Sequence, residues 1–156
     1  MKKRKIGFFG NHVTMPVKQV KAFAALMNKV KHEYDEVEFH IGNTNGTDAE
    51  ALQAVVEGKL ATSIVFYPYK GKEAPSYELT ESILEGIPIV CSVNKNSTFE
   101  QNRALIDSCE ALIAAPKENI ERKDSETWKV INYCKLTKKT LFIVYPEGKV
   151  VRVGDK

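Results

Sequence analysis

The chain has 156 residues, of which 43% are hydrophobic and 28% are charged, with a formal net charge of +3. This balance is typical of a globular protein with one sizeable core, so we expect residues 1–156 to form a single domain. No apolar run approaches the roughly 20 residues that cross a bilayer, which argues against a membrane partner. The basic stretch at residues 2–5 is not followed by an apolar leader, so the sequence predicts a cytoplasmic protein.

The same basic stretch has no interleaved aromatic residues, so nucleic acid is not expected as a partner. The three cysteines, Cys91, Cys109 and Cys134, lie far apart in apolar segments and are expected to be buried free thiols. The three histidines show no ligand spacing with one another or with the cysteines. The sequence therefore predicts neither a metal site nor a cofactor.

Short apolar runs alternate with helical patterns along the whole chain. The predicted strands are residues 6–9, 37–41, 63–67, 89–93, 111–115 and 140–145, with 150–153 as an additional edge or hairpin strand. The predicted helices are residues 17–30, 47–57, 78–85, 98–106 and 125–134. In the first of these helices apolar residues recur every three or four positions, and the other side carries Lys18, Lys21, Asn28 and Lys31.

The alternation of strands and helices defines the predicted fold class. Strands that are apolar on successive positions are typical of a parallel sheet covered on both faces, and strand-helix-strand connections are almost always right-handed crossovers. The sequence therefore predicts a doubly wound, Rossmann-like α/β domain with a mostly parallel sheet of about six strands.

In such a sheet every strand-to-helix loop emerges at the carboxyl edge, where ligands bind. The loop after the second predicted strand, residues 42–48, contains two glycines and leads into a helix that begins with a capping box formed by Thr47 and Glu50. A glycine-rich turn ahead of a helix brings backbone N–H groups close to an anion. This loop is therefore the first candidate for ligand binding.

The other loops at this edge supply groups that suit a nucleotide-like ligand. Arg103 and the two helix N-termini are suited to a phosphate, Asp48 or Asn11 to ribose hydroxyls, and Trp128 or Tyr67 to stacking on a base. The predicted ligand-binding residues are Gly10, Asn11, Gly42, Asn43, Thr44, Gly46, Thr47, Asp48, Asn102, Arg103, Ser125, Thr127 and Trp128.

Five segments carry a resemblance to a known family. They are residues 42–50 (Gly-Asn-Thr-Asn-Gly-Thr-Asp-Ala-Glu), the pair Asn102-Arg103, and residues 112–116, 125–128 and 145–148. In this order they resemble the SLOG superfamily of Rossmann-like nucleotide-binding proteins, which is similar in part to the LOG phosphoribohydrolases and to the DNA-processing protein DprA. The resemblance implies binding of nucleotides or nucleotide-derived signals at the carboxyl edge, and cleavage of an N-glycosidic bond in the enzymatic members.

The chain departs from the enzymatic members at one motif. LOG-type enzymes carry Pro-Gly-Gly-x-Gly-Thr-x-x-Glu, whereas here Glu126 stands at the position of a glycine and Val130 at that of the glutamate. Glycosidic-bond enzymes need a carboxylate or an equivalent group at the anomeric carbon, and valine cannot supply it. An enzyme would have to use Asp48, Glu50, Glu126 or His12 instead, and His12 is the histidine that falls in a predicted strand-end loop.

We therefore expect a protein that binds a nucleotide or a nucleotide-derived small molecule, as a sensor or a sequestering protein. The alternative is a nucleoside or nucleotide N-glycosidase, of the phosphoribohydrolase or deoxyribosyltransferase type, with Glu50, Glu126 and His12 as its catalytic candidates. A DNA-binding module resembling DprA would need a basic face beyond residues 2–5 and is the least favoured of the three. Association into a homo-oligomer is expected because the relatives form dimers.

Overall fold

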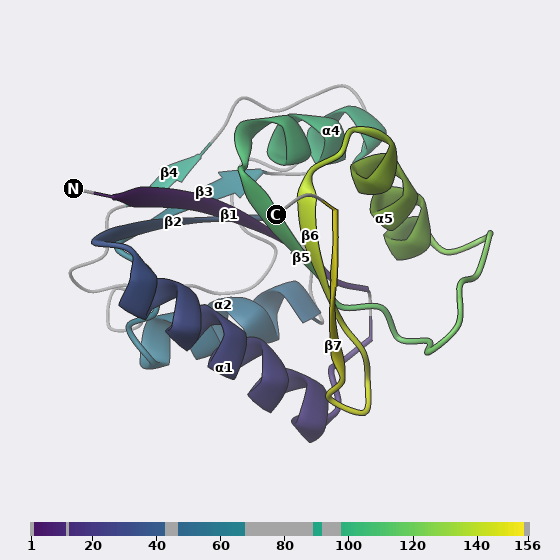
Figure 1. The fold of residues 1–156 in the computed structure, drawn as a ribbon, viewed down its shortest axis with the longest axis horizontal. Helices are drawn as coiled ribbons and strands as arrows, with labels where there is room; N and C mark the ends of the chain where they lie inside the picture. Colours follow the sequence, from purple (N-terminus) through teal and green to yellow (C-terminus); the bar gives the residue numbers. More distant parts are fainter. Residues whose placement is uncertain (1, 12, 43–46, 68–88, 92–97, 155–156) are drawn as a thin grey trace.

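The computed structural model describes residues 2–11, 13–42, 47–67, 89–91 and 98–154. Within these ranges one sheet holds seven strands, which are β1 (Lys3–Phe9), β2 (Glu36–Gly42), β3 (Ser63–Tyr67), β4 (Ile89–Cys91), β5 (Ala111–Ala114), β6 (Thr140–Val144) and β7 (Val150–Val153). The order across the sheet is β4-β3-β2-β1-β5-β6-β7 (Figure 1). All neighbouring pairs are parallel except β6 and β7. The predicted mostly parallel sheet is confirmed. Its seventh strand, β7, is the additional edge or hairpin strand predicted at residues 150–153.

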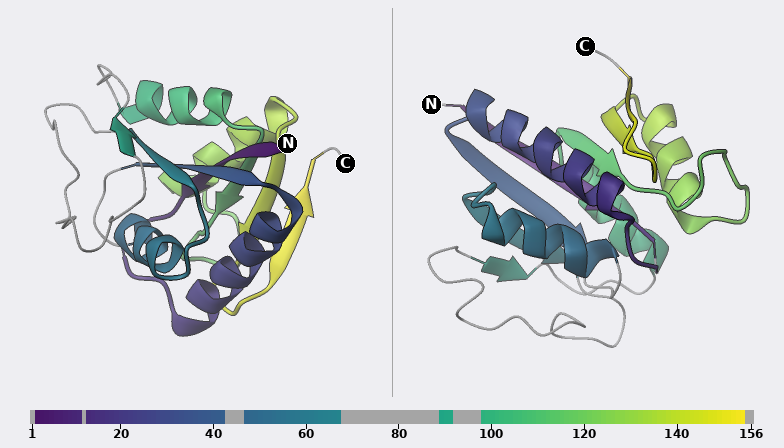
Figure 2. Two further views of the ribbon diagram at one scale, coloured as in Figure 1. Left: turned by 90° about the vertical axis from the view of Figure 1, so that its left-hand side faces the viewer. Right: turned by 90° about the horizontal axis from the view of Figure 1, so that it is seen from below.

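Two helices lie on each face of the sheet in the described part of the chain. They are α1 (Val17–Glu33) and α2 (Thr47–Glu57) on one face, and α4 (Thr98–Ser108) and α5 (Glu126–Leu136) on the other (Figures 1 and 2). The helix predicted at residues 78–85 lies outside the described residues. None of the described helices combines the length and the apolar character required to cross a bilayer. The fold is thus a mixed α/β arrangement.

The central strand β1 belongs to the cores on both sides of the sheet. Ile6 and Phe8 pack with Phe23 and Phe39 on the side of α1 and α2, whereas Phe9 packs on the side of α4 and α5. The rings of Phe8 and Phe23 meet edge to face at 5.1 Å between centroids. Residues 6–9, the second half of β1, are buried on both faces and carry no polar side chain, as is typical of central parallel strands.

The topology fixes where the loops of the molecule gather. From β1 the sheet grows through β2, β3 and β4 to one side, and through β5, β6 and β7 to the other. The loops after β1 and β5 therefore leave the carboxyl edge next to each other, which is the position of the ligand crevice in open α/β sheets. The turn between β6 and β7 lies at the same edge, since β7 runs back antiparallel to β6.

Candidate functional site

The loop after β1 is held by the first residues of two helices. The backbone N–H of Asn11 donates to the Thr47 hydroxyl oxygen at 2.7 Å, and that hydroxyl donates to the Asn11 carbonyl, also at 2.7 Å. On the other side, the Thr127 hydroxyl donates to the Gly10 carbonyl at 2.6 Å. The Asn11 side-chain amide reaches the carbonyl of Ala115, after β5, at 3.0 Å. The structure therefore brings Gly10, Asn11, Thr47 and Thr127 together into one polar network, here called the carboxyl-edge network.

Gly10 is required by the close approach of α2 to this loop. A Cβ atom at Gly10 would lie 1.7 Å from the Thr47 hydroxyl oxygen and 2.5 Å from its Cβ, distances at which no side chain fits. The two residues are packed directly against each other, so the space at the end of β1 is filled by protein atoms. Within the network, the polar groups of Asn11, Thr47 and Thr127 are engaged with one another and with backbone carbonyls.

The first turns of both helices at this edge carry carboxylates. The first turn of α2 carries Asp48 and Glu50, and the first turn of α5 carries Glu126. Glu50 accepts a hydrogen bond from the backbone N–H of Met15 at 2.5 Å, and Asp48 is buried. Negative side chains at a helix N-terminus offset the positive end of the helix dipole. These two termini are therefore poorly suited to a phosphate.

Trp128 is part of the core and not a stacking surface. Its side chain is 3% exposed, its indole N–H donates to Glu118 at 3.2 Å, and its ring lies 6.4 Å from that of Tyr145. Its backbone N–H donates to the Ser125 hydroxyl at 3.4 Å, which caps the start of α5. The expectation that Trp128 stacks on a base is corrected, because burial leaves its ring faces covered. The alternative, Tyr67, is buried as well.

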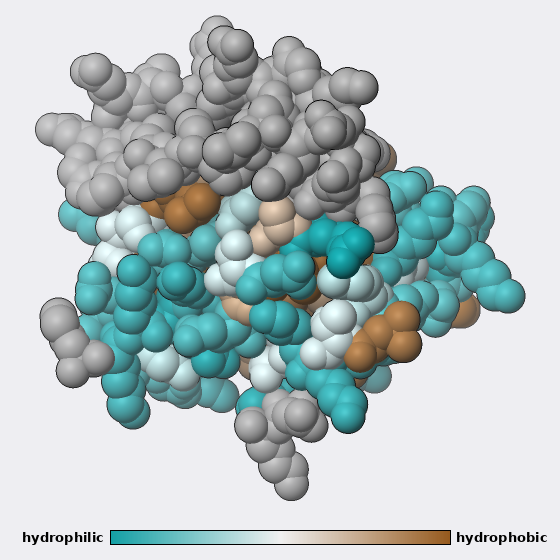
Figure 3. All heavy atoms as spheres, turned by 90° about the horizontal axis from the view of Figure 1, so that it is seen from above, coloured by the Kyte–Doolittle hydropathy of each residue, from teal (hydrophilic) through white to brown (hydrophobic). Residues whose placement is uncertain are grey.

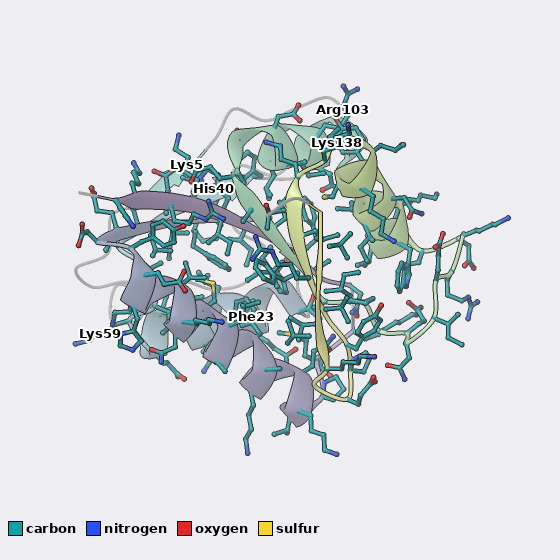
Figure 4. The ribbon with its side chains drawn as sticks, in the orientation of Figure 1. Lys5, Phe23, His40, Lys59, Arg103 and Lys138 are labelled. Atoms are coloured by element: carbon teal, nitrogen blue, oxygen red, sulfur yellow. The ribbon has the colours of Figure 1, made fainter. Side chains whose placement is uncertain are left out.

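Arg103 does not point to the first turns of α2 and α5. Its guanidinium carbon lies 5.5 Å from the ring centroid of Tyr133, on the third turn of α5, and Asn102 beside it is half-buried on α4. Figure 4 shows Arg103 on the outer side of α4. The predicted placement of Arg103 against a phosphate at those helix N-termini is therefore corrected.

The remaining predicted residues divide into two groups. Gly42 ends β2, and a Cβ added there would lie 3.3 Å from a carboxylate oxygen of Asp48, so these two residues are close. His12, Asn43, Thr44 and Gly46 lie outside the described residues. Of the catalytic candidates, Glu126 is exposed and forms a salt bridge with Lys129 at 3.4 Å, on a different helix from Glu50.

Cys109 and Cys134 are buried free thiols. Burial raises the pKa of Cys134 to about 12 and raises that of Cys109 further, which makes both poor nucleophiles. In the ranges covered by the structure, no group of three or more His, Cys, Asp and Glu side chains is placed to hold a metal ion.

Sequence reasoning missed a buried polar row on the α4 side of the sheet. His40 is 3% exposed, its Nδ1 lies 2.7 Å from the Tyr67 hydroxyl, and its Nε2 lies 2.6 Å from Glu38. Glu38 in turn pairs with Lys3 at 3.1 Å. Glu38 and His40 are two residues apart on β2, so their side chains share a face of the sheet. This spacing in the sequence could have predicted their contact.

The sequence analysis also did not identify the outer face of α1 as a candidate binding surface. Lys18, Lys21 and Lys29 recur at helical spacing, are exposed, and lie opposite the side where Phe23 and Met27 are buried. Seen from below, α1 lies at the surface of the molecule (Figure 2). The opposite face, seen from above, is mostly hydrophilic where the structure describes it, with small separate hydrophobic spots (Figure 3).

Comparison with known proteins gives a likeness of fold. No protein-family model matches the chain, and no curated protein matches it in sequence. A solved structure of DNA processing protein A from Helicobacter pylori, described for its single-stranded DNA binding mode, superposes with a TM-score of 0.62 at 13% sequence identity. The match covers 91% of this chain and 65% of that one. It supports a Rossmann-like fold of the DprA type.

This finding overturns two predictions. The sequence predicted a nucleotide or nucleotide-derived small molecule as the ligand, and it did not favour nucleic acid as a partner. The similar solved structure is instead that of a single-stranded DNA-binding protein. The physical reason for the error lies in the carboxyl-edge network, where polar residues expected to meet a small anion bond to one another or to backbone carbonyls, and the first turns of both helices carry carboxylates.

Proposed function

We propose that this chain binds single-stranded DNA, and that the outer face of α1 contacts the phosphate backbone. The observation that carries the proposal is the set of exposed lysines on this face, Lys18, Lys21 and Lys29, which we call the α1 lysine face. At about 1.5 Å of rise per residue, the lysines span roughly 16 Å along the helix. That is long enough to follow several nucleotides of a single strand.

The charge of this face is not offset locally. Helix α1 contains four lysines and one glutamate, a formal net charge of +3 that equals the net charge of the whole chain. No acidic residue stands in its first turn, and among the described residues no carboxylate forms a salt bridge with Lys18, Lys21 or Lys29. Lysines that neutralise phosphates release counterions, which is the main source of sequence-independent affinity for nucleic acid.

The β6–β7 turn extends the same surface. The backbone at Gly148 is packed against Lys18, since a Cβ at Gly148 would lie 3.3 Å from the Lys18 carbonyl oxygen. Lys149 is exposed next to it and adds a fourth lysine to the basic track that we propose for the phosphate backbone.

The experiment is fluorescence anisotropy with a labelled oligothymidylate over a series of salt concentrations. We expect affinity to fall with salt, and the variant Lys18→Ala/Lys21→Ala/Lys29→Ala to lower the log–log slope by about 2, since each phosphate contact on a single strand contributes about 0.7. Three contacts amount to about a 20-fold loss of affinity between 50 and 200 mM salt. Alanine favours helix, so α1 should stay folded in the variant.

The matched control removes three exposed lysines from the other side of the molecule, with the same change in net charge. In the variant Lys123→Ala/Lys129→Ala/Lys135→Ala we expect the slope and the affinity to change little. Equal losses in both variants would show that net charge alone drives binding, and that result would reject the α1 lysine face as the site. Absence of binding at low salt would reject the function itself.

The finer details of architecture belong to this proposal as well. We propose one doubly wound domain of the SLOG type, supported by the strand order around β1 and by helices on both faces of the sheet. Self-association and a cytoplasmic location stay predictions, and sedimentation of the purified protein tests the first of them.

A further inference from the structure

Gln19 is a polar residue in the row of side chains with which α1 faces the sheet. The other members of this row are Phe23, Met27 and Val30, and all four side chains are buried. Gln19 is 0% exposed and lies in the first turn of α1, directly after Lys18 of the α1 lysine face. Because a buried polar side chain needs hydrogen-bond partners, its contacts indicate what it does there.

The amide of Gln19 joins α1 to the ends of two strands. Its Nε2 donates to the carbonyl of Val144, the last residue of β6, at 2.7 Å, and to the carbonyl of Pro116, in the loop after β5, at 2.9 Å. Backbone carbonyls only accept hydrogen bonds, so the NH2 end of the amide must face them. These two bonds, here called the Gln19 joint, tie the first turn of α1 to the carboxyl edge of the sheet.

The other end of the same amide indicates that Gln19 contributes through its donors. Its Oε1 is buried and has no hydrogen-bond partner within the ranges that the structure describes. A buried acceptor without a partner lowers stability, so this oxygen does not favour glutamine over an apolar residue. Methionine has a similar length and would fill the space, but it would not make the joint.

The Gln19 joint stands at the root of the β6–β7 turn, which begins directly after β6. Two backbone hydrogen bonds close this turn, from the Tyr145 N–H to the Lys149 carbonyl at 2.8 Å and from the Gly148 N–H to the Tyr145 carbonyl at 2.9 Å. A Cβ at Gly148 would lie 3.3 Å from the Lys18 carbonyl oxygen, so the turn is packed against α1. Figures 1 and 2 show the turn beside the first residues of α1.

The loop after β5 braces the joint from the other side. The Asn11 side-chain amide donates to the Ala115 carbonyl at 3.0 Å, next to the Pro116 carbonyl that Gln19 holds. Both amides come from the segment that leads into α1 and begins it. A shift of α1 relative to the sheet would therefore break hydrogen bonds at the ends of two strands, which favours one fixed arrangement of α1 and the turn.

We propose that Gln19 is a positioning residue for the DNA-binding surface, and that it keeps Lys149 on the β6–β7 turn in line with Lys18 and Lys21 on α1. Its role rests on the DNA-binding function proposed above. Gln19 is buried and does not itself contact DNA. Lysines on two separate elements meet neighbouring phosphates of one strand at the lowest cost when the elements are already held in place. Without the joint, the turn should leave this line and one phosphate contact should be lost.

Salt-dependent DNA binding tests the role of Gln19. In the wild-type protein, Lys149→Ala should lower the log–log salt slope for oligothymidylate by about 0.7, the contribution of one phosphate contact on a single strand. In Gln19→Met the slope should already be lower by about 0.7, and adding Lys149→Ala should change it no further. The matched control is Gln53→Met, which removes an exposed amide on α2 that donates to Glu57 at 3.0 Å. In this control Lys149→Ala should lower the slope as in the wild type.

Nuclear magnetic resonance tests the joint without DNA. In the wild-type protein both side-chain amide protons of Gln19 should exchange slowly with solvent, and nuclear Overhauser effects should connect Gly148 with Lys18. In Gln19→Met the effects between Gly148 and Lys18 should weaken. The hydrogen bond from the Gly148 N–H to the Tyr145 carbonyl should be retained, because the turn moves without opening.

Three results would overturn the role of Gln19 and leave the DNA-binding proposal standing. One is an equal effect of Lys149→Ala in the wild type and in Gln19→Met, and another is no effect of Lys149→Ala in the wild type. The third is rapid exchange of the Gln19 side-chain amide in the wild-type protein, a result that does not depend on how any variant folds. Absence of DNA binding by the wild type at low salt would instead reject the proposed function, and the role of Gln19 with it.

Discussion

The carboxyl-edge network and the α1 lysine face differ in how far their polar groups are already satisfied. At the edge, Asn11 and Thr47 exchange two hydrogen bonds of 2.7 Å, and Thr127 donates to the Gly10 carbonyl. On α1, in contrast, Lys18 and Lys21 are exposed with no described carboxylate in salt-bridge range. Polar residues gathered at a ligand-prone edge are thus weak evidence for a ligand when they bond to one another, and unmatched charge is the better guide.

The largest effect should come from disturbing the edge at Gly10. In Gly10→Ala the new methyl group would collide with Thr47, so α2 or the loop must move, and overpacking of this kind costs about 3 kcal/mol of unfolding free energy. Urea denaturation measures the loss. Gly42→Ala is the matched control, because its nearest contact would be 3.3 Å and the loss should be far smaller. Equal stability of the two variants would mean that the edge is not tightly packed.

A smaller effect should follow from removing one bond of the network. Thr127→Val deletes the hydroxyl that donates to the Gly10 carbonyl, leaving a partly buried acceptor without this partner at a cost of about 1 kcal/mol. Thermal or urea unfolding measures the change, while affinity for oligothymidylate should remain as in the wild type. If DNA affinity fell instead while stability held, the carboxyl-edge network would be a binding site, although its polar groups bond to one another.

Local patterns along the sequence predicted the mixed α/β architecture and the mostly parallel sheet. The apolar run of residues 6–9 predicted a strand where β1 lies, and residues 150–153 predicted β7 as an extra edge strand. The start of α5 was likewise predicted: a helix was expected from residue 125, and the Ser125 hydroxyl caps a helix that begins at Glu126. Features that depend on neighbours in sequence were therefore recovered well.

The site was harder to predict because its partners lie far apart in the chain. Neither the stacking of Arg103 on Tyr133 nor the bond from Thr127 to the Gly10 carbonyl can be inferred from spacing, since 30 and 117 residues separate the partners. The lysines of α1 were recognised as the outer side of a helix, but their lack of acidic partners is a property of the folded surface.

The smallest effect on stability should come from Lys21→Ala, which touches only the α1 lysine face. Lys21 is exposed and in no described salt bridge, so the unfolding free energy should change by no more than about 0.5 kcal/mol. The salt slope for oligothymidylate should nevertheless fall by about 0.7, the contribution of one phosphate contact on a single strand. Lys135→Ala makes the same charge change on α5 and should leave that slope unaltered. A loss in stability without a change in slope would mean that Lys21 supports the fold and does not meet DNA.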